Sequence, residues 1–105
     1  LFVRTMVTSR PAPDRVIFDA GFKTLPKWHN TPQPVGLSGV KTISLSAEHG
    51  TVTLKEPNHT VKVGEAVDFV VGYGDETVCL QDRLYGIREG IVEVVWPILG
   101  RGKIR

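Results

Sequence analysis

The chain has 105 residues, with 13 Lys and Arg against 11 Asp and Glu, a formal net charge of +2 and one cysteine. This length suits a single compact domain. The small and interleaved charge excludes the clustered basic face that nucleic-acid binding requires. Apolar runs are far shorter than the roughly 20 residues that cross a bilayer, and no signal-peptide pattern is present. We therefore expect a cytoplasmic domain with neither nucleic acid nor membrane as a partner.

The first residues read as part of a strand. The sequence opens at Leu1 in the middle of this strand, LFVRTMV, and no initiator Met precedes it. We expect residues 1–105 to be one domain of a longer polypeptide, so that part of the function lies outside them.

The composition favours strands over helices. Val, Ile and Thr make up 30 of the 105 residues and Ala only four. β-Branched side chains fit a pleated surface better than a helix. Gly and Pro recur every eight to twelve residues or so, which is typical of an antiparallel sandwich or barrel.

In chain order, the first predicted hairpin joins residues 1–9 to 15–19 across a turn at residues 11–14, where prolines preset φ. A second joins the alternating residues 42–49 to residues 51–54 at Gly50.

Residues 66–71 are apolar on both faces, which predicts a strand inside the sheet. The last predicted hairpin joins residues 83–88 to 91–96 across the two-residue turn Glu89-Gly90. Together these elements predict an all-β fold, a small antiparallel β-barrel of seven or eight short strands that closes on itself and leaves no free edges.

Residues 21–39 are not predicted to form a strand, because the prolines there lack the N–H donors that a strand ladder needs. This Pro/Gly-rich stretch carries Phe22, Trp28 and His29. We predict a long loop that is functional or that packs against another part of the domain.

The strongest candidate for a functional site is the pair Tyr73 and Asp75, in the polar stretch of residues 72–78. In extended backbone the two side chains share a face, which indicates a metal or substrate site. The alternative is a turn in which Asp75 bonds neighbouring N–H groups and Tyr73 caps the core. His49 has the parity of Ile43 and Leu45, so it is expected on the apolar side, as a boundary residue or as a ligand.

Two further side chains, Lys23 and Cys79, need an interpretation. Lys23 is either a buried functional amine or a solvated lysine. Cys79 lies between Val78 and Leu80 and is predicted to be a small buried hydrophobe.

Four ordered motifs resemble the C-terminal domain of the D-threonine aldolase and D-serine dehydratase family, which belongs to the alanine-racemase-like, fold-type III pyridoxal-phosphate enzymes. The motifs are residues 7–11 (VTSRP), 19–25 (DAGFKTL), 45–50 (LSAEHG) and 75–80 (DETVCL) continuing to Arg101-Gly102. The resemblance covers nearly the whole chain.

This resemblance implies a β-barrel domain that packs beside an N-terminal (β/α)₈ barrel of the same polypeptide, in a homodimeric enzyme. The Schiff-base lysine and the phosphate-binding loops for pyridoxal phosphate (PLP) would lie in that larger domain. The implied activity is that of an aldolase or dehydratase acting on D-3-hydroxy-amino acids. The present domain would form a wall of the active site and would be inactive by itself.

The family's metal-dependent members carry a His-x-Asp or His-x-Cys pair that binds a divalent ion such as Mn²⁺ or Zn²⁺. Asp75 matches this motif, but Tyr73 stands in place of the His, and a neutral phenol is a poor divalent ligand. The resemblance therefore implies a lost or weakened metal site, with Tyr73 and Asp75 still at the substrate pocket and His49 as a supporting residue.

Other functions remain open from the sequence. One is a free-standing β-barrel that binds a ligand or protein through the Trp28-His29 loop. Another keeps the fold in an amino-acid racemase or a pseudoenzyme.

Overall fold

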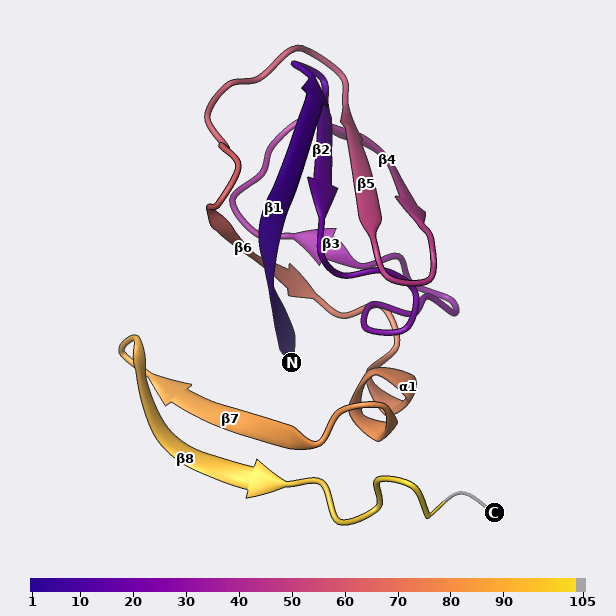
Figure 1. The fold of residues 1–105 in the computed structure, drawn as a ribbon, viewed down its shortest axis with the longest axis vertical. Helices are drawn as coiled ribbons and strands as arrows, with labels where there is room; N and C mark the ends of the chain where they lie inside the picture. Colours follow the sequence, from indigo (N-terminus) through magenta and orange to yellow (C-terminus); the bar gives the residue numbers. More distant parts are fainter. Residues whose placement is uncertain (104–105) are drawn as a thin grey trace.

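The structure, a computed structural model, describes residues 1–103. It contains eight strands and one short helix, so the predicted all-β class and strand number are confirmed (Figure 1). The elements are β1 (Phe2–Ala12), β2 (Arg15–Phe18), β3 (Gln33–Pro34), β4 (Val40–Leu45), β5 (Gly50–Leu54), β6 (Ala66–Val70), α1 (Gly74–Cys79), β7 (Arg83–Arg88) and β8 (Ile91–Pro97). No helix among the described residues has the length and apolar character needed to span a membrane.

Six strands form one curved antiparallel sheet in the order β3-β6-β1-β2-β5-β4. The sheet curls into a half-barrel, and within residues 1–103 the strands β3 and β4 are its edges (Figure 1). The expectation of a closed barrel without edges is therefore wrong. A cavity of about 590 Å³ lies where these edges face each other, lined by Pro34 and Leu37 on one side and Thr42 and Ile43 on the other.

The core follows from strand alternation. Val16 and Phe18 of β2, and Phe69 of β6, are almost completely buried, because alternate side chains of each strand face the concave side of the sheet. Phe18 and Phe69 meet edge to face with ring centroids 5.0 Å apart, a geometry that matches the positive ring edge to the negative ring face. This contact joins two strands that are not neighbours in the sheet, across its curve.

The remaining two strands form a separate hairpin, β7–β8. Its turn residues Glu89 and Gly90 both have positive φ, 49° and 78°, which is the backbone of the predicted two-residue hairpin turn. The predicted position of residues 66–71 is also confirmed, since β6 has β1 on one side and β3 on the other.

An ion pair connects β1 to β6. Arg4 and Asp68 are directly opposed in the antiparallel register, and two guanidinium N–H groups of Arg4 donate to the Asp68 carboxylate at 2.8 and 2.9 Å. The hydrogen bond from Arg4, with its positive charge, lowers the pKa of Asp68. The carboxylate is therefore stabilised in its charged form in the folded state.

This lowered pKa predicts a specific dependence of stability on pH. Because the folded-state pKa of Asp68 lies below its unfolded value, the pair stabilises the fold above the ordinary carboxyl range and ceases to do so as pH falls through the lowered pKa. Asp68→Asn is expected to reduce the urea midpoint slightly at pH 7, and the difference from the parent should disappear near pH 2. Glu56→Gln, at an exposed carboxyl outside the ion pairs seen here, is the matched control and should show no such trend. A difference that persists unchanged at low pH would contradict the assignment.

Candidate functional site

Three segments meet at one end of the half-barrel: the loop at residues 19–32, the β4–β5 turn at residues 46–49, and helix α1 (Figure 1). These segments, with Tyr73 immediately before α1, contain the candidate site residues His49, Tyr73 and Asp75. The loop connects the other two segments, because its first part bonds to the turn and its second part packs on the residues before α1.

The first part of the loop is held to the turn by backbone groups. The N–H of Phe22 donates to the Ser46 carbonyl at 2.7 Å, and the N–H of Lys23 donates to the Ala47 carbonyl at 3.0 Å. At Gly21 a β-carbon would lie 2.4 Å from the backbone nitrogen of His49, a distance that no real side chain tolerates. The motif at residues 19–25 therefore has a structural role, in which glycine permits the close approach of two backbones.

Lys23 and Glu48 form an exposed ion pair at this junction, with Nζ and Oε1 2.6 Å apart. The hydrogen bond from Lys23, together with its charge, lowers the pKa of Glu48. Lys23 is exposed, which confirms the interpretation of a solvated lysine over that of a buried functional amine. Because the pair is exposed on both sides, it contributes little to stability.

His49 lies on the exposed side of the turn, so the prediction that it faces the apolar side is wrong. Strand alternation ends at Leu45, where β4 ends. The Ser46 N–H donates to the His49 carbonyl at 2.9 Å and thus closes a tight turn. Parity counted from Ile43 does not extend through such a turn, and the imidazole is left accessible.

The second part of the loop brings Trp28 beside Tyr73. Their ring centroids are 5.8 Å apart, and the Trp28 indole N–H donates to the His29 Nε2 at 2.6 Å. A side chain at Gly72 would collide with the Asn30 carbonyl at 2.4 Å, so the loop lies directly on the chain that leads from β6 to α1. The predicted packing of this loop is confirmed, and its anchors are the fully buried Pro26 and Pro32.

Helix α1 was not predicted. Tyr73 precedes it in extended backbone, and the Thr77 hydroxyl donates to the Tyr73 carbonyl at 3.0 Å. Residues 74–79 are helical, so the expectation that Tyr73 and Asp75 share the face of an extended strand is wrong. With six residues and a single buried side chain, Thr77, the helix shows no apolar period that a sequence could reveal.

The side chains of this helix have unequal exposure. Asp75 is exposed in the first turn, Tyr73 is partly buried beside Trp28, and Cys79 is partly rather than fully buried. The prediction of a buried Cys79 is corrected accordingly. Asp75 is thus available to a group that approaches from outside the domain.

Neither a metal nor PLP fits the described residues alone. No three His, Cys, Asp or Glu side chains of residues 1–103 come together as a metal site, so Asp75 would need ligands from outside them. All lysines in the described part of the chain are exposed, whereas a Schiff-base lysine requires desolvated surroundings that lower its pKa. Burial of such a lysine would need groups from outside the described residues.

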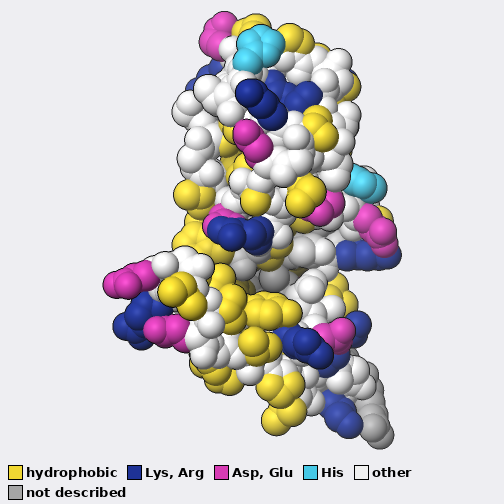
Figure 2. Space-filling model, turned by 60° about the vertical axis from the view of Figure 1, so that its left-hand side comes forward, with side chains coloured by type: hydrophobic (Ala, Val, Ile, Leu, Met, Phe, Trp, Pro, Cys, Tyr) yellow, Lys and Arg dark blue, Asp and Glu magenta, His cyan; other side chains and the backbone are white. Residues whose placement is uncertain are grey.

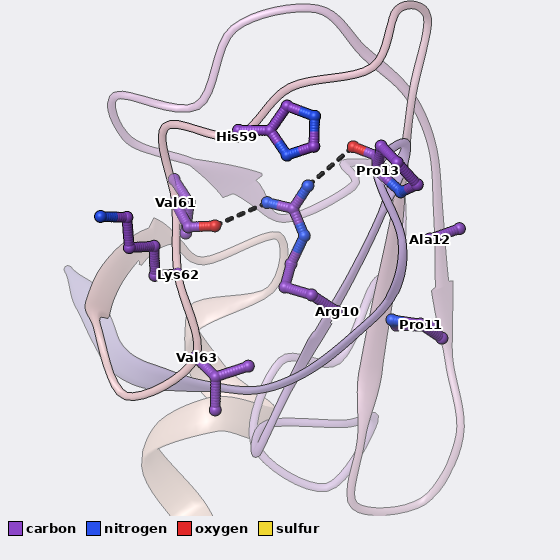
Figure 3. A pocket seen from close by; sticks show the side chains of 8 residues that line it. All are labelled: Arg10, Pro11, Ala12, Pro13, His59, Val61, Lys62 and Val63. Atoms are coloured by element: carbon purple, nitrogen blue, oxygen red, sulfur yellow. Dashed lines mark hydrogen bonds between the residues drawn. The ribbon is translucent and has the colours of Figure 1, made fainter.

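A second pocket lies at the opposite end of the half-barrel (Figure 3). Its centre is the Arg10 guanidinium, which donates to the carbonyls of Val61 at 2.6 Å and Pro13 at 2.7 Å, and to that of Asn58. Nothing in the sequence pattern indicated this role of Arg10. Three carbonyls accept from the two terminal nitrogens of Arg10, and its buried Nε has no hydrogen-bond partner among the described residues. The three bonds tie residues 58–61 to the β1–β2 hairpin, which gives Arg10 a structural role.

The half-barrel sheet with its appended short helix and hairpin makes the chain an all-β domain. It belongs to the family described as "Putative serine dehydratase domain", whose model matches residues 1–87. The chain is 37% identical over 102 residues to a D-threonine aldolase of Arthrobacter sp and 37% identical over 103 residues to a 3-hydroxy-D-aspartate aldolase of Paracoccus denitrificans.

These similarities span 97% and 98% of the chain but only 27% and 26% of the two relatives. The crystal structure of a D-threonine aldolase from Filomicrobium marinum is similar with a TM-score of 0.89 and 31% identity, over 99% of this chain and 29% of that one. The chain thus spans about a quarter of the length of the relatives it matches.

The close approach at Gly21 generates a stability prediction. Gly21→Ala places a methyl group against three backbone atoms that cannot move independently, so we expect a loss of about 3 kcal/mol or more in the free energy of unfolding. Gly100→Ala, where the added carbon meets no atom within 4 Å, should change it by less than about 0.5 kcal/mol. Urea unfolding of both variants is the measurement, and equal effects would show that the approach to residues 46–49 is not constraining.

Proposed function

We propose that this chain is the C-terminal domain of a PLP-dependent lyase that acts on D-3-hydroxy-amino acids. The observation that carries the proposal is the match of almost the whole chain to about a quarter of two aldolases that act on such compounds by name. The rest of the polypeptide would hold the cofactor and its lysine, and the complete enzyme would be a homodimer.

In this proposal the domain contributes one wall of the substrate pocket. Trp28 and Tyr73 form an aromatic surface, and the adjacent Asp75 presents an exposed carboxylate. An aromatic wall excludes water from the reacting groups, and a fixed carboxylate orients the substrate's hydroxyl or ammonium group. The PLP ring, bound by the other domain, would supply the electron sink of the reaction.

The carboxylate of Asp75 has a second possible use in the same pocket. A divalent ion held by Asp75 and by ligands outside this chain would act as a Lewis acid on the substrate's β-hydroxyl group. Tyr73 offers a phenol where metal-dependent relatives of this type offer an imidazole, so the affinity for Mn²⁺ or Zn²⁺ would be weak.

The full-length polypeptide, purified with PLP and assayed with D-threonine, D-3-hydroxyaspartate and D-serine, tests the function. We expect aldol cleavage or dehydration of at least one of these substrates, with a modest response to added Mn²⁺ or Zn²⁺. Interconversion of D- and L-amino acids without cleavage or dehydration would indicate a racemase instead. Absence of all three reactions, in a protein that contains PLP, would contradict the proposal and favour a pseudoenzyme.

The role of Asp75 predicts a separation of activity from stability. In the full-length polypeptide Asp75→Ala should reduce kcat/KM by about a hundredfold or more, in the range expected when a group that handles a substrate proton is removed. Its exposure predicts a change in the free energy of unfolding of less than about 0.5 kcal/mol. Glu56→Ala, an exposed acid distant from α1 in the chain, is the control for both measurements. Equal losses of activity and stability would make Asp75 a structural residue.

A further inference from the structure

The pocket at the β1–β2 end of the half-barrel gathers basic side chains without an acid. It has a volume of about 440 Å³, within the range of small-molecule sites. Three of its lining residues are basic, namely Arg10, His59 and Lys62, and the others, at positions 11–13, 61 and 63, are Pro, Ala or Val. The pocket thus combines positive charge with an apolar wall.

Arg10 lies at the centre of this pocket with an incomplete set of partners. Its two terminal nitrogens donate to carbonyls, whereas its buried Nε has no acceptor among the described residues. A guanidinium group donates from all three of its nitrogens, and a buried donor without an acceptor costs free energy. Arg10 therefore retains the capacity to bind a further acceptor.

The charge of the pocket is not neutralised by a carboxylate. Every ion pair found in residues 1–103 lies elsewhere, and none includes a residue of this pocket. The carboxylate of Glu65 accepts from the backbone N–H of Lys62 at 3.0 Å, and neither Asp14 nor Glu56 lines the pocket. The carbonyls around Arg10 are dipoles, so they stabilise its charge without cancelling it. A concave surface of uncancelled positive charge attracts anions.

The arrangement leaves the basic groups accessible. Figure 3 shows the guanidinium group between the carbonyls of Val61 and Pro13, with the His59 ring facing it and the Lys62 ammonium group pointing outward. Figure 2 shows a histidine and Lys or Arg side chains at the upper end of the molecule, where Figure 1 places the β1–β2 turn. Because His59 and Lys62 are both exposed, a ligand reaches them from solvent.

We infer that this pocket binds a small organic anion. Its phosphate or carboxylate oxygens would lie toward Arg10 and His59, and its apolar group would pack on the Pro and Val side chains. His59 would donate a ring N–H to the anion, and hydrogen bonds to charged groups are stronger than neutral ones. Lys62 would add charge at the rim. The inference concerns the end of the half-barrel opposite α1 and goes beyond the proposed function.

Binding would also strengthen a junction between two segments of the chain. The Asn58 N–H donates to the Pro13 carbonyl at 3.0 Å, and the bonds of Arg10 supply further links between residues 58–61 and the β1–β2 hairpin. An anion in contact with both His59 and Arg10 adds another link. A ligand that binds only the folded state stabilises it, so slower hydrogen exchange of residues 58–63 is the expected local effect.

The test uses the full-length polypeptide saturated with PLP, so that a phosphate site for that cofactor elsewhere in the protein is already occupied. Phenyl phosphate and benzoate are the probes, because they share a ring and differ in the anionic group. Benzyl alcohol, which has the ring without the charge, is the neutral control. Calorimetric titration measures the affinity, and hydrogen exchange of residues 58–63 locates the binding.

Three substitutions accompany the parent. His59→Ala removes the proposed donor, and Lys62→Gln removes the charge at the rim. Lys41→Gln removes the same charge from an exposed position on β4 and is the matched control. Arg10 is left intact, because its bonds hold the β1–β2 end together.

We expect at least one anionic probe to bind and to slow the exchange of residues 58–63, with the tighter probe identifying the anionic group. His59→Ala should weaken the affinity about tenfold, since a hydrogen bond to a charged group is lost. Lys62→Gln should weaken it about twofold, since its charge is exposed, and Lys41→Gln should leave it unchanged.

Unchanged exchange of residues 58–63 with both anionic probes at about 10 mM, beyond the weak end of specific recognition, would overturn the inference. Binding of benzyl alcohol as tight as that of benzoate would also overturn it, because the charge would then have no part. An affinity unaltered in a folded His59→Ala variant would do the same. The parent measurement decides even if a variant fails to fold. Aldolase activity enters none of these readouts, so failure of the proposed function and failure of this inference are separate results.

Discussion

Two close backbone approaches, at Gly21 and at Gly72, determine how the candidate site is arranged. At each position the neighbouring chain lies so near that a β-carbon would be 2.4 Å from a backbone atom. The first approach fixes the loop to the β4–β5 turn and the second fixes the same loop to the segment before α1. Because both contacts involve backbone on both sides, they leave little freedom for the loop to move. Tyr73 and Trp28 come together as a consequence of this double attachment.

The half-barrel supplies the rigid support for this end. Phe18 and Phe69 close its core across the curve of the sheet, and Arg4 with Asp68 connects β1 to β6 on the outside. The chemistry-bearing residues themselves lie on a loop, a turn and a short helix. A rigid sheet that presents functional groups on its connections is a common division of labour in proteins.

The family assignment and the geometry point in the same direction. The domain matches about a quarter of two aldolases, has no lysine buried among its described residues, and leaves a carboxylate and an apolar hairpin exposed. In the proposed function these exposed groups would face the rest of the polypeptide.

The sequence by itself determined the all-β class, three hairpins, the turn of the last one and the family, because strand alternation and turn residues such as Glu89-Gly90 are local properties of the chain. It placed the turn of the second hairpin at Gly50, whereas the turn is at residues 46–49 and Gly50 begins β5. It could not reveal α1, whose single buried residue leaves no period, nor the outward position of His49, since parity ends where the Ser46 turn begins. It also predicted a closed barrel where the sheet has edges at β3 and β4. Only the tertiary structure decided that Trp28 packs beside Tyr73 and that the apolar side chains of the β7–β8 hairpin are exposed. Both results depend on contacts, made or missing, between residues far apart in the chain.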